Sequence, residues 1–489
     1  MSSLPPQQAS FYWHDYETFG TDSRRDRPSQ FAGQRTTLDL EPIGEPLTLY
    51  CQPAPDVLPQ PMSCLITGIT PQFAQHNGVI EAEFAARVNE QLAQPGTCGA
   101  GFNSIRFDDE FTRNLLYRNF YDPYEREWKD GNSRWDIIDL VRMCYALRPE
   151  GVEWPRHADG VVSFRLEDLS AANDLAHARA HDAQSDVQAT IALARRIKAA
   201  QPRLWNFYLG LRRKQEALKL LDYVQRSPVL HVSARFGAER ACLAMVAPLA
   251  AHPDQPNKII VYDLDADPAP LLELDADAVA QRVFTARSEL PEGMARVPLK
   301  VVHANRSPAL APMSVLRPGD AERIGLDVPR ALRHLQQLQG AADLTEKVRR
   351  VFARAETNSE DADAELSLYR GFCSDGDRRR CAEIRRTPRM ELTRGKFEFQ
   401  DARYADLLFR YRARNFPQTL DAEELALWQA FRRERLTQET PLTGLTLRQF
   451  REEIVASRTL PALTAAQHAV LDRLDAWALE TAMEIGAAE

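Results

Sequence analysis

The sequence has no closely spaced cysteine pair and no long hydrophobic run. Its seven cysteines are scattered, with no C-x-x-C pair, which argues against structural zinc or a disulfide framework and favours a reducing compartment. No apolar run approaches the roughly 20 residues of a membrane-spanning helix. The first ten residues, MSSLPPQQAS, lack the basic start and apolar core of a secretory signal. The sequence therefore predicts a cytoplasmic protein without a membrane partner.

Internal repeats and low-complexity tracts are also lacking, and basic residues are outnumbered by acidic ones. Taken as an average, the net charge of −8 argues against a nucleic-acid partner. That average hides a local excess, because residues 378–414 hold twelve Arg or Lys against five Asp or Glu. Segregated charge of this kind can form a cationic face that attracts phosphates. An ordinary solvated helical face explains the same residues equally well.

A chain of 489 residues is too long for one core, and two to four domains are expected. Residues 11–200 have an α/β pattern. The strand candidates lie at 11–16, 47–51 and 97–102, and the helical patterns lie at 81–93, 107–120 and 184–200. Short β-rich runs within 229–312 predict a small barrel or sandwich. Helical spacing returns at 320–355, the acidic segment 356–365 resembles a linker, and helical patterns then continue to the end.

Two carboxylates interrupt the first strand candidate, FYWHDYETFG at 11–20. Side chains two apart on a strand share a face, so Asp15 and Glu17 would project side by side. Paired anions at the end of a buried strand repel each other and are costly to desolvate. A hard divalent cation, which takes oxygen ligands, relieves both costs. A chance D-x-E pair on a solvated edge is the alternative.

Two further acidic positions lie in the same α/β region. Asp108, next to Asp109, opens a helical run and follows Asn103 by five residues. Acidic residues there suit the helix dipole, which is a structural explanation for both. Later, His181 stands just before a helix and Asp186 lies one turn inside it, on a face that is otherwise apolar. A carboxylate on such a face needs a partner, whereas a lone histidine before a helix is more often a surface or capping residue.

Together Asp15, Glu17, Asp108 and Asp186 supply the four carboxylates that a two-metal phosphodiester hydrolysis site needs. Such a site holds two Mg²⁺ or Mn²⁺ ions about 4 Å apart and stabilises the attacking and leaving oxygens together. A neutral His181 can accept a proton from the attacking water.

In order and spacing these motifs resemble those of the DEDDh 3′→5′ exonucleases. The three motifs are Asp15-Tyr16-Glu17, Asn103 to Asp108, and His181 to Asp186. Longer phrases resemble the bacterial exonuclease I family in particular: HDYETFG, LPQP, LITGITPQ, NFYDPY, NSRWDIIDLVR, CYALRPEG and YRARNFP. They extend from the first strand to the C-terminal region. The loop after the first motif and residues 340–400 are less similar to the family.

The resemblance implies an RNase H-like α/β exonuclease domain over 1–201, an SH3-like barrel with a helical extension over 202–355 and a helical C-terminal domain over 356–489. It also implies direct metal ligation by Asp15, Glu17 and Asp186, with Asp108 completing the set. His181 would be the general base, and Glu17 and Arg165 would contact the nucleotide at the scissile phosphate. The implied partners of a monomer are single-stranded DNA and the acidic C-terminal tail of single-stranded DNA-binding protein, the latter received by Arg148 and Arg317.

Single-strand binding needs backbone charge together with flat side chains on which bases stack. The segment 113–142 supplies both, in Arg113, Arg118, Tyr124, Trp128, Arg134 and Arg142. Aromatic residues in a large protein are more often part of a core. Tyr124 and Trp128 are the better candidates because charged residues surround them. The arginines of 378–414 are expected to line the opposite wall.

The prediction is therefore a Mg²⁺-dependent 3′→5′ exonuclease that degrades single-stranded DNA processively to 5′-mononucleotides in DNA repair and recombination. An RNA-trimming exonuclease with the same carboxylates is one alternative. A non-catalytic single-strand-binding adaptor is the other, although it has no use for four clustered acids.

Overall fold

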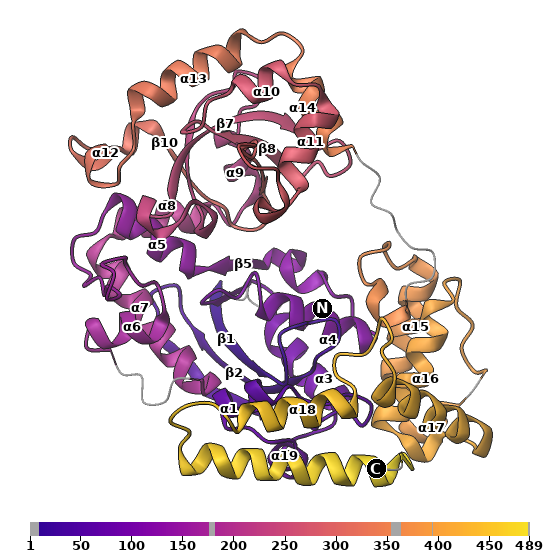
Figure 1. Cartoon of the computed structure of the whole chain (residues 1–489). Coiled ribbons are helices and arrows are strands. Elements are labelled where there is room, and N and C mark those ends of the chain that lie inside the picture. The colour runs from indigo at the N-terminus through magenta and orange to yellow at the C-terminus, as the bar shows by residue number, and fades with distance from the viewer. Residues whose placement is uncertain (1–8, 176–180, 354–362, 394, 488–489) are drawn as a thin grey trace, which may run out of the picture. The chain divides into compact units, whose positions relative to one another are not determined.

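The computed structural model describes residues 9–175, 181–353, 363–393 and 395–487. By their internal contacts these residues form two compact units. The first unit comprises 1–133, 178–188 and 358–489, and the second comprises 134–177 and 189–357. Figure 1 shows the elements of both units along the chain.

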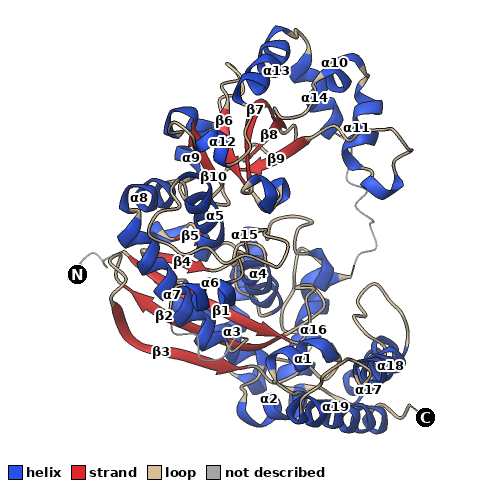
Figure 2. Cartoon of the chain, turned by 60° about the vertical axis from the view of Figure 1, so that its left-hand side comes forward, coloured by secondary structure: helices blue, strands red, loops and turns tan. Residues whose placement is uncertain are grey.

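The first unit contains the strand that carries the D-x-E pair. Strand β1 (Ser10–Thr18) pairs antiparallel with β2 (Pro28–Thr36) and parallel with β4 (Thr97–Gly101), while β3 (Pro42–Tyr50) pairs with β2. The strand order is β3-β2-β1-β4-β5, and the boundary between the units falls inside β5 (Ser133–Asp136). Figure 2 shows these strands in red. Bulky residues such as Phe11 and Trp13 are fully buried in β1, so the strand lies in the centre of its core.

Strand β2 is an element that the sequence pattern does not indicate. Its sequence PSQFAGQRT is poor in β-branched residues and contains Pro and Gly. Pairing with β1 along eight positions fixes it as a strand. Gly33 is required there, because a Cβ atom at this position would lie 2.4 Å from the Tyr12 hydroxyl oxygen.

Alternation along β1 separates its apolar and acidic side chains. Tyr12 and Tyr16 pack with Phe31 of β2, Phe84 of α3 (Glu81–Leu92) and Leu115 of α4 (Asp108–Arg118). Residues at odd positions point to the opposite face, so Asp15 and Glu17 project away from that cluster. The helix α7 (Ala183–Ala200), whose first residues belong to this unit, carries Asp186.

The C-terminal helices pack against N-terminal ones in the same unit. Helices α1 (Pro61–Thr67) and α2 (Pro71–Asn77) share a core with α18 (Leu447–Ser457) and α19 (Ala465–Glu484). Figure 1 shows α18 and α19 side by side. The remaining helices of the unit are α15 (Asp375–Arg386), α16 (Arg403–Asn415) and α17 (Ala422–Thr437).

The second unit contains the β-rich segment. Five antiparallel strands occur in the order β10-β6-β7-β8-β9. They are β6 (Val229–Val232), β7 (Leu243–Ala251), β8 (Lys258–Asp263), β9 (Leu299–His303) and β10 (Ala309–Pro312). The helices of this unit are α5 (Ile137–Leu147), α6 (Leu166–Ala172), most of α7, α8 (Pro202–Gly210), α9 (Lys214–Leu220), α10 (Ala269–Glu273), α11 (Ala276–Phe284), α12 (Asp320–Arg323), α13 (Val328–Gly340) and α14 (Leu344–Phe352).

The predicted fold class is confirmed: a mixed sheet with helices, an antiparallel barrel-type sheet, and a helical C-terminal part. The helical pattern of the C-terminal part is interrupted near 415–417, at the end of α16, and at 440–445, between α17 and α18. None of the helices in the described ranges is long and apolar enough to cross a membrane.

Candidate functional site: an acidic cluster beside a histidine

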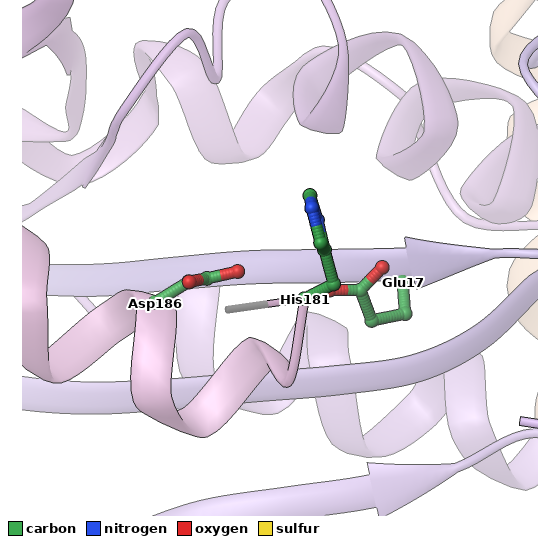
Figure 3. Close-up of side chains that lie close together, drawn as sticks. All are labelled: Glu17, His181 and Asp186. Carbon is green, nitrogen blue, oxygen red and sulfur yellow. The ribbon is translucent and has the colours of Figure 1, made fainter. Parts of the chain in front are cut away.

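Three of the predicted site residues meet at the end of β1. Glu17, His181 and Asp186 each offer one ligand atom, and these atoms lie within 4.8 Å of one another. Figure 3 shows Glu17 from the strand, Asp186 from α7 and His181 from the segment before that helix, with their side chains gathered at one place. His181 has a left-handed backbone with a φ of 62°, a conformation that is uncommon outside glycine and is often found at functional sites.

Asp108 reaches the same strand from the N-terminus of α4. Its Oδ1 atom accepts a hydrogen bond of 2.9 Å from the backbone N–H of Tyr16, which lies between Asp15 and Glu17. Its neighbour Asp109 is held elsewhere, in a buried ion pair of 2.7 Å with Arg126. The two adjacent acids are thus distinguished by their partners: Asp108 joins the cluster, and Asp109 does not.

The carboxyl groups of the cluster suppress each other's ionisation. Burial raises the pKa of Asp15 well above its usual value, and the charges of Asp108, Glu17, Asp186 and Asp182 raise it further. Burial, followed by Asp186 and Asp182, raises the pKa of Glu17 to about 8. Uncompensated anions have therefore been brought together at one site, which is the electrostatic situation that a bound cation relieves.

This cluster predicts an unusual dependence of stability on pH in metal-free protein. Between pH 4.5, the ordinary pKa of a glutamate, and about 8, folded Glu17 keeps a proton that the unfolded chain releases. The unfolding free energy should therefore fall as pH rises through this window. Melting temperatures measured in EDTA from about pH 5 to about pH 9 should fall less steeply for Glu17→Gln than for the wild type. Equal slopes for the two proteins would show that Glu17 is not the titrating group.

Two residues of the site were not predicted from the sequence. Asp182 raises the pKa of both Asp15 and Glu17, and its own Oδ1 atom accepts a hydrogen bond of 3.1 Å from Gln30 Nε2. The Gln30 side chain also accepts a hydrogen bond from the backbone N–H of Ala183, at 3.1 Å. Gln30 therefore fixes the start of α7 against β2. The available signal was an Asp directly before the helix, which is typical of an N-cap.

The donor set fits hard divalent cations. Carboxylate oxygens predominate, and the histidine nitrogen is the only other donor type in the group of three. Burial first, and repulsion from neighbouring carboxyl groups second, raise the pKa values of Asp15 and Glu17, and a bound cation would oppose both effects. Glu17, Asp186, Asp15 and Asp108 are the residues that would hold such ions.

Comparisons with known proteins match this arrangement over nearly the whole chain. A family model described as exonuclease matches residues 12–194. Models for the exonuclease I SH3-like domain and the exonuclease I C-terminal domain match 212–354 and 362–481. Exodeoxyribonuclease I of Escherichia coli K12 is 49% identical over 433 residues, which cover 88% of this chain and 91% of that protein. The chain belongs to the exonuclease I family.

Other members of the exonuclease I family are similarly close. The Haemophilus influenzae exodeoxyribonuclease I is 45% identical over 87% of this chain and 90% of its own length. The structure of exonuclease I from Methylocaldum szegediense has a TM-score of 0.93 at 51% identity, covering 97% of this chain and 99% of that one. An E. coli exonuclease I in complex with a dA16 oligonucleotide has a TM-score of 0.91 at 45% identity, over 97% and 100% of the chains. The predicted family and enzyme class, an exodeoxyribonuclease, are confirmed.

Membership of the exonuclease I family also bears on the metal. Enzymes with this acidic motif set depend on metal ions, and an E. coli exonuclease I–single-stranded DNA complex has been solved in a zinc-bound form. Metal dependence is therefore established at the level of the family.

The predicted substrate contacts in the first unit differ in their exposure. Trp128 is 65% exposed, and Tyr124 is partly exposed, with its ring 6.0 Å from that of Phe372. Arg113 is buried and makes a two-pronged ion pair with Glu127, with distances of 2.7 and 2.8 Å. Its guanidinium lies 5.3 Å from the centre of the Tyr124 ring. Arg113 therefore supports an aromatic surface rather than presenting a charge to solvent. Arg118 is likewise buried, in an ion pair with Glu81.

The second unit contains the other predicted contacts. The Arg165 side chain is 70% exposed and lies 3.1 Å from Glu167. Arg142 is buried beside Asp139 at 2.7 Å, and Arg134 is also buried.

The two predicted tail-binding residues also belong to the second unit. Arg148 lies 3.5 Å from Asp320, and the more exposed Arg317 lies 3.4 Å from Glu150. Burial, followed by the nearby charge of Arg317, lowers the pKa of Arg148, so the two guanidinium groups are close to each other.

The expected cationic wall of 378–414 needs correction at its C-terminal end. Arg410, Arg412 and Arg414 have largely buried side chains. Arg412 pairs with Glu424, and the other two contact Glu365. These three arginines are therefore internal ion-pair partners. The more exposed arginines of the segment, such as Arg378 and Arg380, lie in α15.

Proposed function

We propose that this member of the exonuclease I family hydrolyses single-stranded DNA from its 3′ end and releases 5′-mononucleotides. The observation that carries the proposal is the gathering of Glu17, His181 and Asp186 within 4.8 Å. Asp15 and Asp108 add two more carboxyl groups, linked to the same strand by charge and by a hydrogen bond. A binding module would not require this accumulation of mutually repelling groups.

In this proposal His181 accepts the proton of the attacking water. It lies beside Glu17 and Asp186, with the ligand atoms of the three residues within 4.8 Å of one another, which places the imidazole where a general base is needed. His181 has a left-handed backbone and lies just before α7. Glu17 has a second role in the proposal, as a contact to the terminal nucleotide.

We propose two Mg²⁺ ions, with Mn²⁺ as a substitute, held by Asp15, Glu17, Asp108 and Asp186. When bound, such ions stabilise the charge that develops on the attacking and leaving oxygens. The carboxyl groups themselves must lose their protons before they bind a cation, so affinity should rise with pH up to about 8, the pKa of Glu17.

For the DNA strand we propose stacking of bases on Trp128 and Tyr124. An exposed indole is a suitable platform, since stacking contributes roughly 1–3 kcal/mol per base and tolerates any sequence. Arg165 is proposed to contact a phosphate near the scissile bond, because its guanidinium is largely exposed. Arg113 and Arg142 are proposed to act indirectly, by holding Tyr124 and Phe164 through contacts of their guanidinium groups with the rings.

The acidic tail of single-stranded DNA-binding protein remains a proposed partner, received by Arg148 and Arg317. Their neighbouring guanidinium groups offer two charges to an anionic peptide. A fluorescent acidic peptide should bind the wild type, and more weakly at high salt. The affinity of the peptide for the Arg317→Ala variant should be lower than its affinity for the wild type. Unchanged affinity in that variant would exclude the site.

End-labelled single-stranded DNA is the direct test of the activity. With Mg²⁺ present, label at the 3′ end should be released at once as a mononucleotide, whereas 5′-labelled strands should shorten progressively. EDTA should stop both reactions. Release of label first from the 5′ end, or unimpaired digestion in EDTA, would overturn the proposal.

A matched RNA strand separates the DNA enzyme from an RNA-trimming one. Family membership favours DNA, and we expect RNA to be degraded far more slowly. Binding without degradation of either strand would instead indicate the adaptor.

Several properties predicted from the sequence remain predictions. They are the three domain ranges 1–201, 202–355 and 356–489, the monomeric state, the cytoplasmic location and the role in DNA repair.

A further inference from the structure

Two cysteines that take no part in the proposed hydrolysis lie together at the start of α15. Cys373 lies directly before Ser374, which caps the helix, and Cys381 lies in its second turn. Both side chains line one cavity of about 230 Å³. Cys381 and the hydroxyl of Tyr404 lie close enough to Cys373 to lower the pKa of its thiol.

Cys373 differs in exposure from the other cysteines. The structure describes all seven, and six of them are buried, whereas Cys373 is partly exposed. The cavity beside it has walls formed by aromatic and charged side chains, including Tyr124, Phe372 and Arg378. A small reagent can therefore reach Cys373 from this cavity, whereas Cys381, which lines the same cavity, is buried.

The surroundings of Cys373 favour the thiolate. The hydrogen bond from Cys381 is the main cause that lowers the pKa of Cys373 to about 7, with Tyr404 contributing and burial opposing. The N-terminus of the 12-residue helix α15 acts in the same direction, because its dipole stabilises negative charge. The pKa of Cys381 is raised by the same hydrogen bond and by burial, so this residue keeps its proton.

We propose that Cys373 and Cys381 form a peroxide-reactive dithiol, in which Cys373 is the attacking thiolate and Cys381 the resolving thiol. The Cys373 sulfur attacks one oxygen of hydrogen peroxide, the O–O bond breaks, and hydroxide leaves and takes a proton to become water. Cys373 is then a sulfenic acid. The Cys381 sulfur attacks the Cys373 sulfur, the S–O bond breaks and a second water leaves. Two thiols and one peroxide thus give one disulfide and two waters.

Peptide mapping of the whole chain tests the proposal. Arginines 378–380 separate the two cysteines, so trypsin places them in the peptides GFCSDGDR (371–378) and CAEIR (381–385). After treatment with one equivalent of peroxide and blocking of free thiols, these peptides should appear as one linked species that reduction splits. The peptide carrying Cys144 is the internal control, since this thiol is buried and its pKa is raised to about 12.

Variants separate the two steps. Cys381→Ser should stop at the sulfenic acid, which a dimedone adduct on 371–378 would reveal, and Cys373→Ser should leave Cys381 unoxidised. Tyr404→Phe keeps the ring but removes a hydrogen bond, so the pH midpoint for alkylation of Cys373 by iodoacetamide should move above its wild-type value near 7. Wild-type Cys373 that reacts no faster than Cys144, or that accumulates as sulfenic acid without linkage, would overturn the proposal.

Discussion

Asp186→Asn is expected to abolish hydrolysis without destabilising the metal-free protein. Asp186 raises the pKa of both Asp15 and Glu17 by repulsion. Removing its charge relieves that repulsion, so the melting temperature in EDTA should stay equal or rise. Activity should fall by roughly 10²-fold or more, because changes to residues that only orient metal ligands already cost 10–100-fold.

Melting curves with and without Mg²⁺ test the ligand role separately from catalysis. An ion that binds only the folded state, at a free concentration of about 100 times its Kd, raises the free energy of unfolding by ~2.7 kcal/mol. We expect Mg²⁺ to raise the melting temperature of the wild type more than that of Asp186→Asn. Asp406→Asn is the matched control, since it removes an exposed helical aspartate in α16. An Asp186→Asn protein that cleaves at the wild-type rate would remove Asp186 from the proposed site.

The residues of the acidic cluster were predictable because each belongs to a short local pattern. Asp15 and Glu17 interrupt an apolar strand, and His181 and Asp186 are placed by the start of one helix. Such spacing fixes direction within an element. It does not distinguish Asp108 from Asp109, which depends on Tyr16 and Arg126, residues of two other segments.

The residues that escaped prediction depend on contacts distant in sequence. Asp182 matters because Gln30, 152 positions earlier, donates a hydrogen bond to it. The charge count of 378–414 could not show that Arg414 pairs with Asp56, 358 positions earlier. Local composition reports the number of charges in a segment, whereas burial and pairing decide whether those charges are available to a ligand.

Glu365→Gln should strongly destabilise the first unit. Glu365 is 1% exposed, and its oxygens lie 2.7 Å from Arg27 and 2.6 Å from Arg414. Burial alone would raise the pKa of Glu365, but the guanidinium groups of Arg414, Arg27 and Arg435 hold it well below its usual value. Glutamine keeps the shape but leaves buried cations without this partner, and removal of one partner of a buried ion pair costs roughly 3–5 kcal/mol.

Urea unfolding of the variant measures this cost, with Glu391→Gln as the control. Glu391 is exposed and lies 3.2 Å from Lys396, so its replacement should change stability by less than about 1 kcal/mol.

The pH dependence of the unfolding free energy is a second, independent test of Glu365. The lowered pKa of Glu365 means that its contribution is complete above the ordinary glutamate pKa and is lost as pH falls. Glu365→Gln should therefore lose less stability than the wild type as pH falls. This pH dependence has the opposite sign to that of Glu17, whose raised pKa makes stability fall as pH rises. Equal destabilisation by Glu365→Gln and Glu391→Gln would show that the buried ion pairs do not hold Arg27 and the C-terminal helices together.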